Sequence, residues 1–249
     1  MNYRRKFYEA TKINMTSAVE IVPHVVQLVS PSSVVDVGCG VGGWLAAFRD
    51  QGVKDFLGID GKWVHLDDLL IAKDNFRRHD LSTPFNVERR FDLAISLEVA
   101  EHIPPASAPA FIDSLTRLSD VVLFSAAIPF QGGTNHFNEQ WPPYWIEKFG
   151  ALGFELFDVL RPRFWDHPTI RWWYAQNMLL FVRGSSVKRY PLLEAERTTG
   201  DFRGFPLVHP RRWEKQCDPK KVKLVNAVRQ CGKVLAADVK GRLNPGSGR

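Results

Sequence analysis

The chain has 249 residues, of which 45% are hydrophobic, and carries a formal net charge of +6. It can bury one full α/β core, but no run approaches the roughly 18 apolar residues of a membrane span, and the N-terminus lacks the apolar segment of a signal peptide. The three cysteines have the spacing of neither a disulfide framework nor a metal site. We therefore expect one main domain in a reducing compartment, in a cytoplasmic protein without a transmembrane segment.

The first predicted elements alternate between helix and strand. Residues 16–29 predict a helix capped by Thr16 or Ser17, in which Pro23 either kinks the helix or marks its true start. Alternation of strand and helix in the residues that follow is typical of a parallel sheet with helices on both faces. Strands are expected at 33–37, 55–59 and 75–79, and helices at 42–50 and 65–72.

One glycine-rich segment, SVVDVGCGVGGW, joins an apolar strand to a helix. Gly38, Gly40 and Gly42 allow a sharp turn and the close approach of a ligand, and the free amides of the helix point at that ligand. Gly38, Gly40 and Gly43 also fit the dinucleotide pattern G-x-G-x-x-G. Asp36 favours another ligand, because its carboxylate would repel a pyrophosphate but attract a molecule that carries an ammonium and a sulfonium.

The second half of the chain continues the alternation and adds two irregular segments. Residues 129–143, PFQGGTNHFNEQWPP, have the composition of a functional loop beside the carboxyl ends of the strands. Residues 161–174, RPRFWDHPTIRWWY, interrupt the last two strands and are too aromatic for a plain turn. The regular elements expected here are strands at 91–96, 120–126, 154–160 and 176–182, and helices at 108–118 and 144–152.

The strand DFLGID ends at Asp60, about one strand-helix-strand unit after the glycines, where an acid is placed to bind ribose hydroxyls. With the later segments RRHDL and FDLAISLEVAEHIP, the order and spacing resemble the class I S-adenosylmethionine-dependent methyltransferases over about residues 30–183. The resemblance implies an α/β fold with a doubly wound, mostly parallel seven-stranded sheet and an antiparallel last strand. It also implies methyl transfer with S-adenosylmethionine as cofactor.

The resemblance also implies a division of the chain into three parts. An N-terminal helical segment at 1–30 precedes the methyltransferase domain at 31–184, and a basic extension follows at 185–249. Within the domain, residues 129–143 are expected to form the substrate loop and residues 161–174 an insertion.

The resemblance assigns the glycine loop to the methionine end of the cofactor. Asp36 would help to hold that end, and Gly38, Cys39 and Gly40 would lend backbone contacts. The alternative for these residues is a tight turn with a purely structural role.

The nucleoside end of the cofactor is assigned to later residues by the same resemblance. Asp60 would bind the ribose hydroxyls, Asp80 would bind the adenine amino group and Leu81 would flank the ring. For Asp80, the cap of a turn or helix is the alternative. Glu98 lies in SLEVAEHIP, a segment whose backbone lies against the cofactor in related small-molecule methyltransferases.

The segment TNHFNEQW offers the candidates for catalysis, His136 and Glu139. Methyl transfer to a hydroxyl needs alignment, exclusion of water and a base that takes the proton as the C–O bond forms. We expect His136 to be that base, with Glu139 orienting it or binding substrate. The alternative is that both residues cap and brace the loop.

No metal site is predicted, because the residues that could bind a metal are scattered along the chain. The aromatic residues are unusually many and suit a lid over planar ligands or sugars, although core packing explains at least half of them. The candidate ligands are His79, Asp80, Glu98, Glu101, His102, His136, Asp166 and His167, and the aromatic residues are Trp44, Trp63, Trp141, Trp145, Trp165, Trp172, Trp173 and Tyr174.

The basic charge belongs to the C-terminal part of the chain. Residues 209–249 contain 11 Lys and Arg against 3 Asp and Glu, so the rest of the chain has a small acidic excess. Residues 220–235 predict a basic amphipathic helix, which would contact nucleic acid, anionic lipid or an acidic partner, or simply face solvent. The final GRLNPGSGR has the composition of a disordered end.

Three functions remain open at this point. The first is methylation of a small molecule, at a hydroxyl of a sugar, lipid precursor or natural product. The second is an RNA methyltransferase that grips phosphates with the basic tail. The third is a non-catalytic module that binds the cofactor. The chain lacks the N/D-P-P-Y type of segment with which enzymes hold a flipped nucleobase, which argues against DNA modification.

Overall fold

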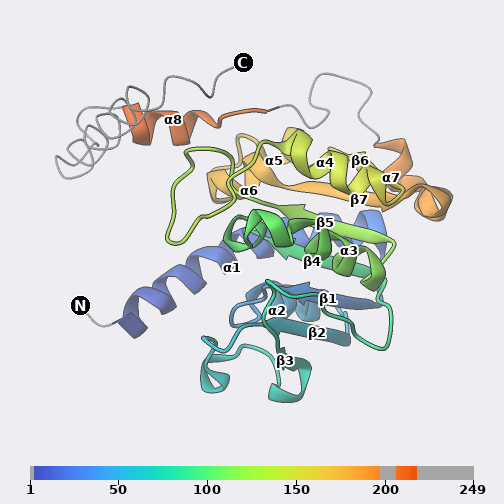
Figure 1. The fold of residues 1–249 in the computed structure, drawn as a ribbon, viewed down its shortest axis with the longest axis horizontal. Helices are drawn as coiled ribbons and strands as arrows, with labels where there is room; N and C mark the ends of the chain where they lie inside the picture. The colour runs from blue at the N-terminus through green and yellow to red at the C-terminus, as the bar shows by residue number, and fades with distance from the viewer. Residues whose placement is uncertain (1–2, 197–205, 218–249) are drawn as a thin grey trace. The chain divides into compact units, whose positions relative to one another are not determined.

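The computed structural model describes residues 3–196 and 206–217. The chain divides into two compact units, Met1–Leu207 and Val208–Arg249, of which the first holds the sheet (Figure 1). The described part of the second unit contains one helix, α8 (Pro210–Cys217). The basic helix predicted at 220–235 and the predicted disordered end lie outside the described residues.

The first unit is built on a seven-stranded sheet with the order β3-β2-β1-β4-β5-β7-β6. Strand β7 is antiparallel to both of its neighbours, and the remaining pairs are parallel. The predicted doubly wound sheet with an antiparallel last strand is thus confirmed. The strands are β1 (Ser33–Val37), β2 (Asp55–Asp60), β3 (Phe76–Arg78), β4 (Leu93–Leu97), β5 (Val121–Ser125), β6 (Phe154–Phe157) and β7 (Leu179–Arg183).

The central strands are apolar on both faces because helices cover both sides of the sheet. Every residue of β4 (LAISL) and β5 (VVLFS) is buried, as expected for strands without a solvent-facing side. One apolar cluster packs α1, α2, α5, α6 and α7 against one face, and a second packs α3 and α4 against the other. The helices are α1 (Tyr3–Val29), α2 (Gly43–Asp50), α3 (Ala108–Leu118), α4 (Pro142–Ala151), α5 (Leu160–Phe164), α6 (Trp172–Asn177) and α7 (Pro191–Ala195).

None of the described helices combines the length and the hydrophobicity that crossing a bilayer requires. The segment that follows the last strand also belongs to the first unit. Val187, Tyr190 and Leu193 are buried in the same cluster as α1. The first compact unit extends to Leu207.

The N-terminal helix differs from its prediction at its start. It begins at Tyr3, so Thr16 and Ser17 lie inside it, and the prediction that one of them caps the helix was wrong. The preceding residues include Arg, Lys, Glu and Ala, which continue a helix readily. Ser17 instead accepts a hydrogen bond at its Oγ from the backbone N–H of Arg171, at 3.0 Å. Pro23 lies within the helix on an exposed position and does not mark its start.

Two further predictions of regular structure were wrong. The helix expected at 65–72 is replaced by short 3-10 turns at Leu66–Asp68 and Lys73–Asn75. The backbone N–H of Leu70 donates to the carbonyl of Val41 at 2.8 Å, so a contact with the glycine loop fixes this segment in place of helical bonds. The strands expected at 154–160 and 176–182 are shorter, because helix α5 begins at the end of the first expected strand and helix α6 extends into the start of the second.

A buried ion pair joins β6 to the insertion. Asp158 and Arg161 each expose 3% or less of their surface, and both carboxylate oxygens of Asp158 accept hydrogen bonds from the guanidinium. A charge removed from water in this way depends on its partner. The pair therefore fixes the point at which strand β6 gives way to helix α5.

We expect Asp158→Ala to lower the free energy of unfolding by about 3–5 kcal/mol, because the buried guanidinium of Arg161 would lose the carboxylate that accepts its hydrogen bonds. Asp113→Ala provides a matched control, since the ion pair between Asp113 and Arg117 is exposed and contributes less than about 1 kcal/mol. Urea unfolding of both variants measures the difference. Equal costs would contradict a structural role for the buried pair.

Candidate functional site

A cavity of about 470 Å³ lies at the carboxyl edge of the parallel strands. Its lining includes the residues that directly follow or end successive strands, Gly38 after β1, Asp60 at the end of β2, Asp80 after β3 and Glu98 after β4. Residues Thr134, Asn135 and Phe137 of the loop after β5 complete one side. Open α/β sheets bind their ligands at this edge. The predicted substrate loop at 129–143 therefore borders the cavity.

Gly38 occupies a position that only glycine can take. Its φ of +88° lies in the left-handed region, and a Cβ there would come within 2.2 Å of the Val99 side chain. Its backbone N–H donates to the carbonyl of Ile59 at 2.7 Å. The loop is thus pressed between β2 and the segment after β4, and its backbone faces the cavity.

Asp60 ties the glycine loop to strand β2. One carboxylate oxygen accepts the backbone N–H of Gly40 and the other accepts that of Gly61, each at 2.6 Å. Burial raises the pKa of Asp60, and these two hydrogen bonds oppose the rise. A carboxylate oxygen retains further lone pairs, so Asp60 can accept a hydrogen bond from a ligand as well.

Asp36 lies beneath the loop as a buried carboxyl group. Its Oδ2 has no hydrogen-bond partner within the described structure, and burial followed by the charge of Asp60 raises its pKa well above the usual value. Burial also raises the pKa of the Cys39 thiol. Of the predicted cofactor residues that the structure describes, Asp36, Cys39 and Gly40 are not part of the cavity lining.

Asp80 and Leu81 form the far wall of the cavity. Oδ1 of Asp80 accepts hydrogen bonds from the Ser82 hydroxyl at 2.7 Å and the Ser82 backbone N–H at 3.0 Å, which lower the pKa of Asp80. The turn-capping role that the sequence left open is therefore present. The carboxylate nevertheless lines the cavity, beside the buried side chain of Leu81.

Glu98 is held in an unusual backbone conformation by amide side chains. Its φ is +56°, which is uncommon for a residue with a side chain and marks local strain. Its carboxylate accepts a hydrogen bond from Gln131 Nε2 at 2.8 Å and another from Asn177 Nδ2 at 3.0 Å. Burial raises the pKa of Glu98, and the amide donors oppose the rise. The sequence did not identify Gln131 or Asn177, because no local pattern connects residues so far apart.

His136 and Glu139 form a hydrogen-bonded pair in the loop after β5. His136 Nδ1 lies 2.8 Å from Oε1 of Glu139, and an ionised carboxylate can only accept, so Nδ1 is the donor. The same carboxylate accepts the backbone N–H groups of Phe130 and Gly132, each at 2.8 Å. Glu139 therefore braces the loop and orients the imidazole, which combines the two roles considered from the sequence.

The fold brings together three of the residues that are scattered in the sequence. One ligand atom each from Glu101, His102 and His136 lies within 4.8 Å of the others. The two imidazole rings meet edge to face with 4.8 Å between their centroids. Nδ1 of His102 lies 3.1 Å from the carbonyl oxygen of Asn135 and is the donor, and burial lowers the pKa of His102.

Glu101 is the most deeply buried member of this cluster. Its Oε2 has no hydrogen-bond partner in the described structure. Burial, followed by the charge of Glu98, raises its pKa well above the usual value. Its backbone carbonyl accepts the N–H groups of Phe137 and Asn138 at 2.9 and 3.0 Å, which fastens the loop to the segment after β4.

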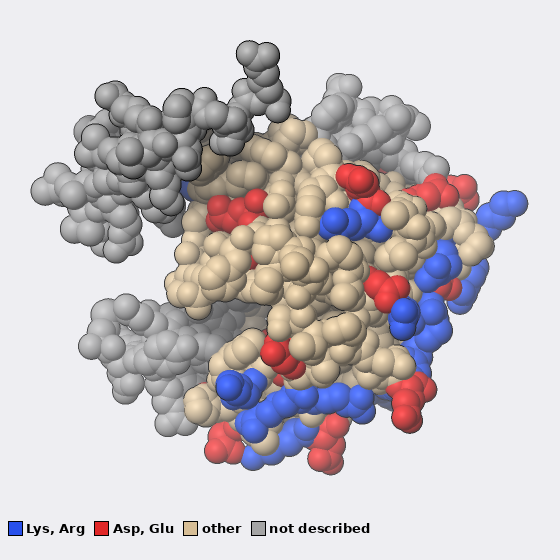
Figure 2. Space-filling view, in the orientation of Figure 1, with Lys and Arg blue, Asp and Glu red and all other residues tan. Residues whose placement is uncertain are grey.

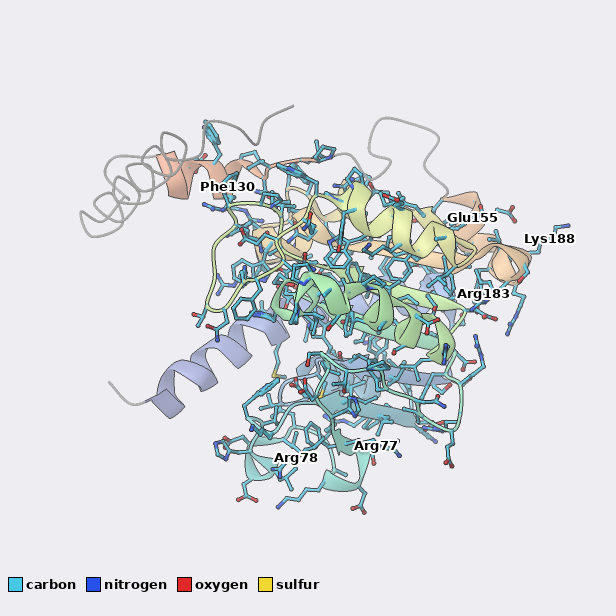
Figure 3. The ribbon with its side chains drawn as sticks, viewed as in Figure 1. Arg77, Arg78, Phe130, Glu155, Arg183 and Lys188 are labelled. Atoms are coloured by element: carbon cyan, nitrogen blue, oxygen red, sulfur yellow. The ribbon has the colours of Figure 1, made fainter. Side chains whose placement is uncertain are left out.

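The aromatic residues divide between the core and the rim of the site. Trp44, Trp145 and Tyr174 are buried, as the core-packing alternative required. Trp63 lines the cavity with 64% of its surface exposed. Phe130, in the loop after β5, is 81% exposed and lies at the opposite end of the sheet from Glu155, Arg183 and Lys188 (Figure 3).

Comparisons with known proteins were made against family models, curated proteins and solved structures. A family model described as a methyltransferase domain matches residues 18–183. The magnesium protoporphyrin IX methyltransferase of Synechocystis PCC 6803, solved with bound SAH, is 21% identical, with 74% of this chain and 88% of that chain covered and a TM-score of 0.53. Streptomyces venezuelae DesVI is 14% identical, with 73% and 99% covered and a TM-score of 0.53. The curated proteins gave no match.

We expect Gly38→Ala to destabilise the protein and to abolish binding in the cavity, because the new Cβ would collide with Val99. Gly52→Ala is the matched control, since Gly52 also has a positive φ but nothing lies within 4 Å of its Cβ position. Left-handed strain alone costs about 1–2 kcal/mol, and the collision adds about 1–3 kcal/mol. Urea unfolding of both variants measures this. A larger loss in the Gly52 variant would contradict the steric argument.

We expect Asp36→Asn to raise the melting temperature of the ligand-free protein at neutral pH. A carboxyl whose pKa is raised by folding contributes no penalty in acid, and destabilises the fold progressively as the pH rises toward its folded pKa. The difference between variant and wild type should therefore shrink in acid. Asp80→Asn should show the opposite sign, because hydrogen bonds from Ser82 lower the pKa of Asp80. Thermal unfolding over a pH series tests both expectations. If the difference in melting temperature between Asp36→Asn and the wild type did not change with pH, folding would not raise the pKa of Asp36.

Proposed function

Because the chain belongs to the family of methyltransferase domains, we propose that it transfers a methyl group from S-adenosylmethionine to a hydroxyl of a small molecule. A sugar, a lipid precursor or a natural product would supply this hydroxyl. The single observation that carries the proposal is the cavity at the carboxyl edge, which is lined by Gly38, by three acids, by His102 and by residues of the loop that carries His136, although His136 itself is not part of the lining.

The cofactor side of the cavity fits S-adenosylmethionine, which when bound supplies a methyl group on a positively charged sulfur. Gly38 lines the cavity without a side chain, so a ligand can lie against its backbone. The buried carboxyl of Asp36 has an unpaired oxygen, and a cationic ligand at this end would favour the ionised forms of Asp36 and Asp60, which burial disfavours. Gly38, Cys39 and Gly40 would lend backbone contacts, as the sequence analysis expected.

The nucleoside end is assigned to residues on the neighbouring strands. Asp60 would accept hydrogen bonds from the ribose hydroxyls, for which it retains lone pairs. Asp80 would accept the adenine amino group, and buried Leu81 would flank the ring. Glu98, fixed by its amide donors, would present its strained backbone to the ligand.

The acceptor side is assigned to the loop at 129–143. Glu139 holds Nδ1–H of His136, so Nε2 carries the lone pair of the neutral ring. An imidazole oriented by a carboxylate is a familiar means of removing a proton from a hydroxyl. We assign to His136 Nε2 the proton that leaves the acceptor oxygen as its bond to the methyl carbon forms.

A nucleic-acid acceptor has weaker support from the described surface. In the view of Figure 2, Lys and Arg lie mainly along the lower and right-hand margins, with Asp and Glu interspersed among them. Arg89 pairs with Asp55 at 2.6 Å and Arg90 with Asp120 at 2.5 Å. Such pairing reduces the positive potential that phosphate binding requires. A module without catalysis would have no need for the oriented His136.

We expect His136→Ala to retain affinity for S-adenosylmethionine but to lower methyl transfer by roughly 10²–10⁴-fold, the usual contribution of a positioned base. His65→Ala is the control, because His65 is exposed and lies outside the loop after β5. Calorimetry measures the affinity, and transfer of a labelled methyl group to a panel of sugars, phenols and RNA measures activity.

Three results would contradict the proposal in distinct ways. Failure of the wild-type chain to bind S-adenosylmethionine would remove the cofactor assignment. Transfer to RNA alone would replace the acceptor class. Full activity in the His136 variant would leave that residue only its bracing role in the loop.

A further inference from the structure

The cluster of Glu101, His102 and His136 has a ligand-binding geometry that the proton-transfer role of His136 alone does not use. Glu101 and His102 lie in the turn after β4, and His136 comes from the loop after β5. One nitrogen or oxygen of each lies within 4.8 Å of the other two. A single ion placed among them would be within reach of two imidazoles and one carboxylate.

Both histidines are fixed in the tautomer that leaves Nε2 free to bind. The carbonyl of Asn135 can only accept a hydrogen bond, so Nδ1 of His102 carries the proton. The carboxylate of Glu139 imposes the same tautomer on His136. Histidines that bind metals almost always donate their other ring N–H to a carbonyl or a carboxylate in this way.

Glu101 supplies an independent observation that points to a ligand. Its side chain is 99% buried, yet Oε2 has no hydrogen-bond partner among the described residues. Buried polar atoms without a partner are rare in folded proteins, and an unseen ion is one of the explanations they call for. A cation beside Oε2 would satisfy this atom and offset its loss of hydration.

The backbone around the cluster is held in place without a ligand. The carbonyl of Glu101 accepts two backbone N–H groups from Phe137 and Asn138, and the Glu139 carboxylate accepts two more from Phe130 and Gly132. Nε2 of His136 would lie 2.0 Å from a Cβ on Gly133, so this edge of the imidazole is next to the glycine backbone, and any side chain at residue 133 would cover it. Sites of this kind bind well when the groups that orient their ligands are themselves fixed.

We propose that Glu101, His102 and His136 bind one divalent transition-metal cation, of the class of Zn²⁺, Mn²⁺, Fe²⁺ or Co²⁺. Imidazole and carboxylate ligands suit these ions, and hard Mg²⁺ and Ca²⁺ prefer a shell made of oxygen alone. Three protein ligands leave coordination positions open, which is the arrangement of catalytic rather than structural metal sites.

The inference rests on the proposed function for the identity of the acceptor and deepens it, because with the cation bound the metal replaces His136 as the group that activates the hydroxyl. With the cation bound, His136 Nε2 donates its lone pair to the metal, and a cation lowers the pKa of a hydroxyl that occupies an open position. The hydroxyl proton passes to water, the oxygen forms a bond to the methyl carbon, and the carbon–sulfur bond breaks with its electron pair left on sulfur. Charges and atoms balance without any oxidant or reductant.

The test is a titration of the full chain, stripped with a chelator, with Co²⁺ alone, followed by the visible absorption of the ion and by calorimetry. We expect one Co²⁺ per chain. Glu139→Gln removes only a group that orients His136, so it should weaken Co²⁺ binding by about 10–100-fold. His102→Ala and Glu101→Gln each remove a ligand of the ion, so they should weaken Co²⁺ binding by more than that. His65→Ala should bind Co²⁺ as the wild type does.

Binding of S-adenosylhomocysteine by each variant shows that it has folded and tests the cofactor site separately. Absence of Co²⁺, Zn²⁺ and Mn²⁺ binding in a wild-type chain that binds this ligand would overturn the cation site and leave the proposed function standing. Unchanged Co²⁺ affinity in the His102 and Glu101 variants would also overturn it. Cation binding in a chain that transfers no methyl group would instead count against the proposed function.

Discussion

Several carboxyl groups lie close together at the edge of the sheet where the parallel strands end. The organisation of the site depends on which groups donate hydrogen bonds to them. The charge of Asp60 raises the cost of ionising Asp36 beneath the glycine loop, and the charge of Glu98 does the same to Glu101 in the turn after β4. Backbone N–H groups donate hydrogen bonds to the carboxylate of Asp60, and amide side chains donate hydrogen bonds to the carboxylate of Glu98. For Asp36 and Glu101 the described protein leaves an oxygen unpaired, so both carboxyl groups suit a positively charged ligand.

The unpaired oxygens of Asp36 and Glu101 lie in two different halves of the site, to which we assign different ligands. The half at Asp36 and Asp60 is closed by glycine backbone and suits the cationic end of a cofactor. The half at Glu101 faces two imidazoles from the turn after β4 and the loop after β5. Glu98 lies between the halves, and its left-handed backbone persists because Ser125, Gln131 and Asn177 all bond to it. Positions that lower stability here are the positions to which we assign a ligand.

The local features of the chain were predictable because they arise from neighbouring residues. The apolar strands, the glycine turn and the helix at 108–118 each follow from period, propensity or conformational freedom within a few residues. The failures have a common cause, since a distant contact replaced the local preference. Ser17 bonds to Arg171 rather than capping a helix, and the segment around Leu70 bonds to the glycine loop rather than to its own turns.

The sequence by itself determined the alternation of strands and helices, the glycine turn and the position of the loop at 129–143, because these follow from consecutive residues, while the arrangement of the sheet came from the resemblance to a known family. Only the tertiary structure decided which side chains meet at that edge. Asn177 reaches Glu98 from the end of helix α6, and His136 reaches His102 from the next loop. Parallel strands bring their carboxyl ends together through long connections. Residues far apart in the chain therefore become neighbours, and no local sequence pattern predicts their contact.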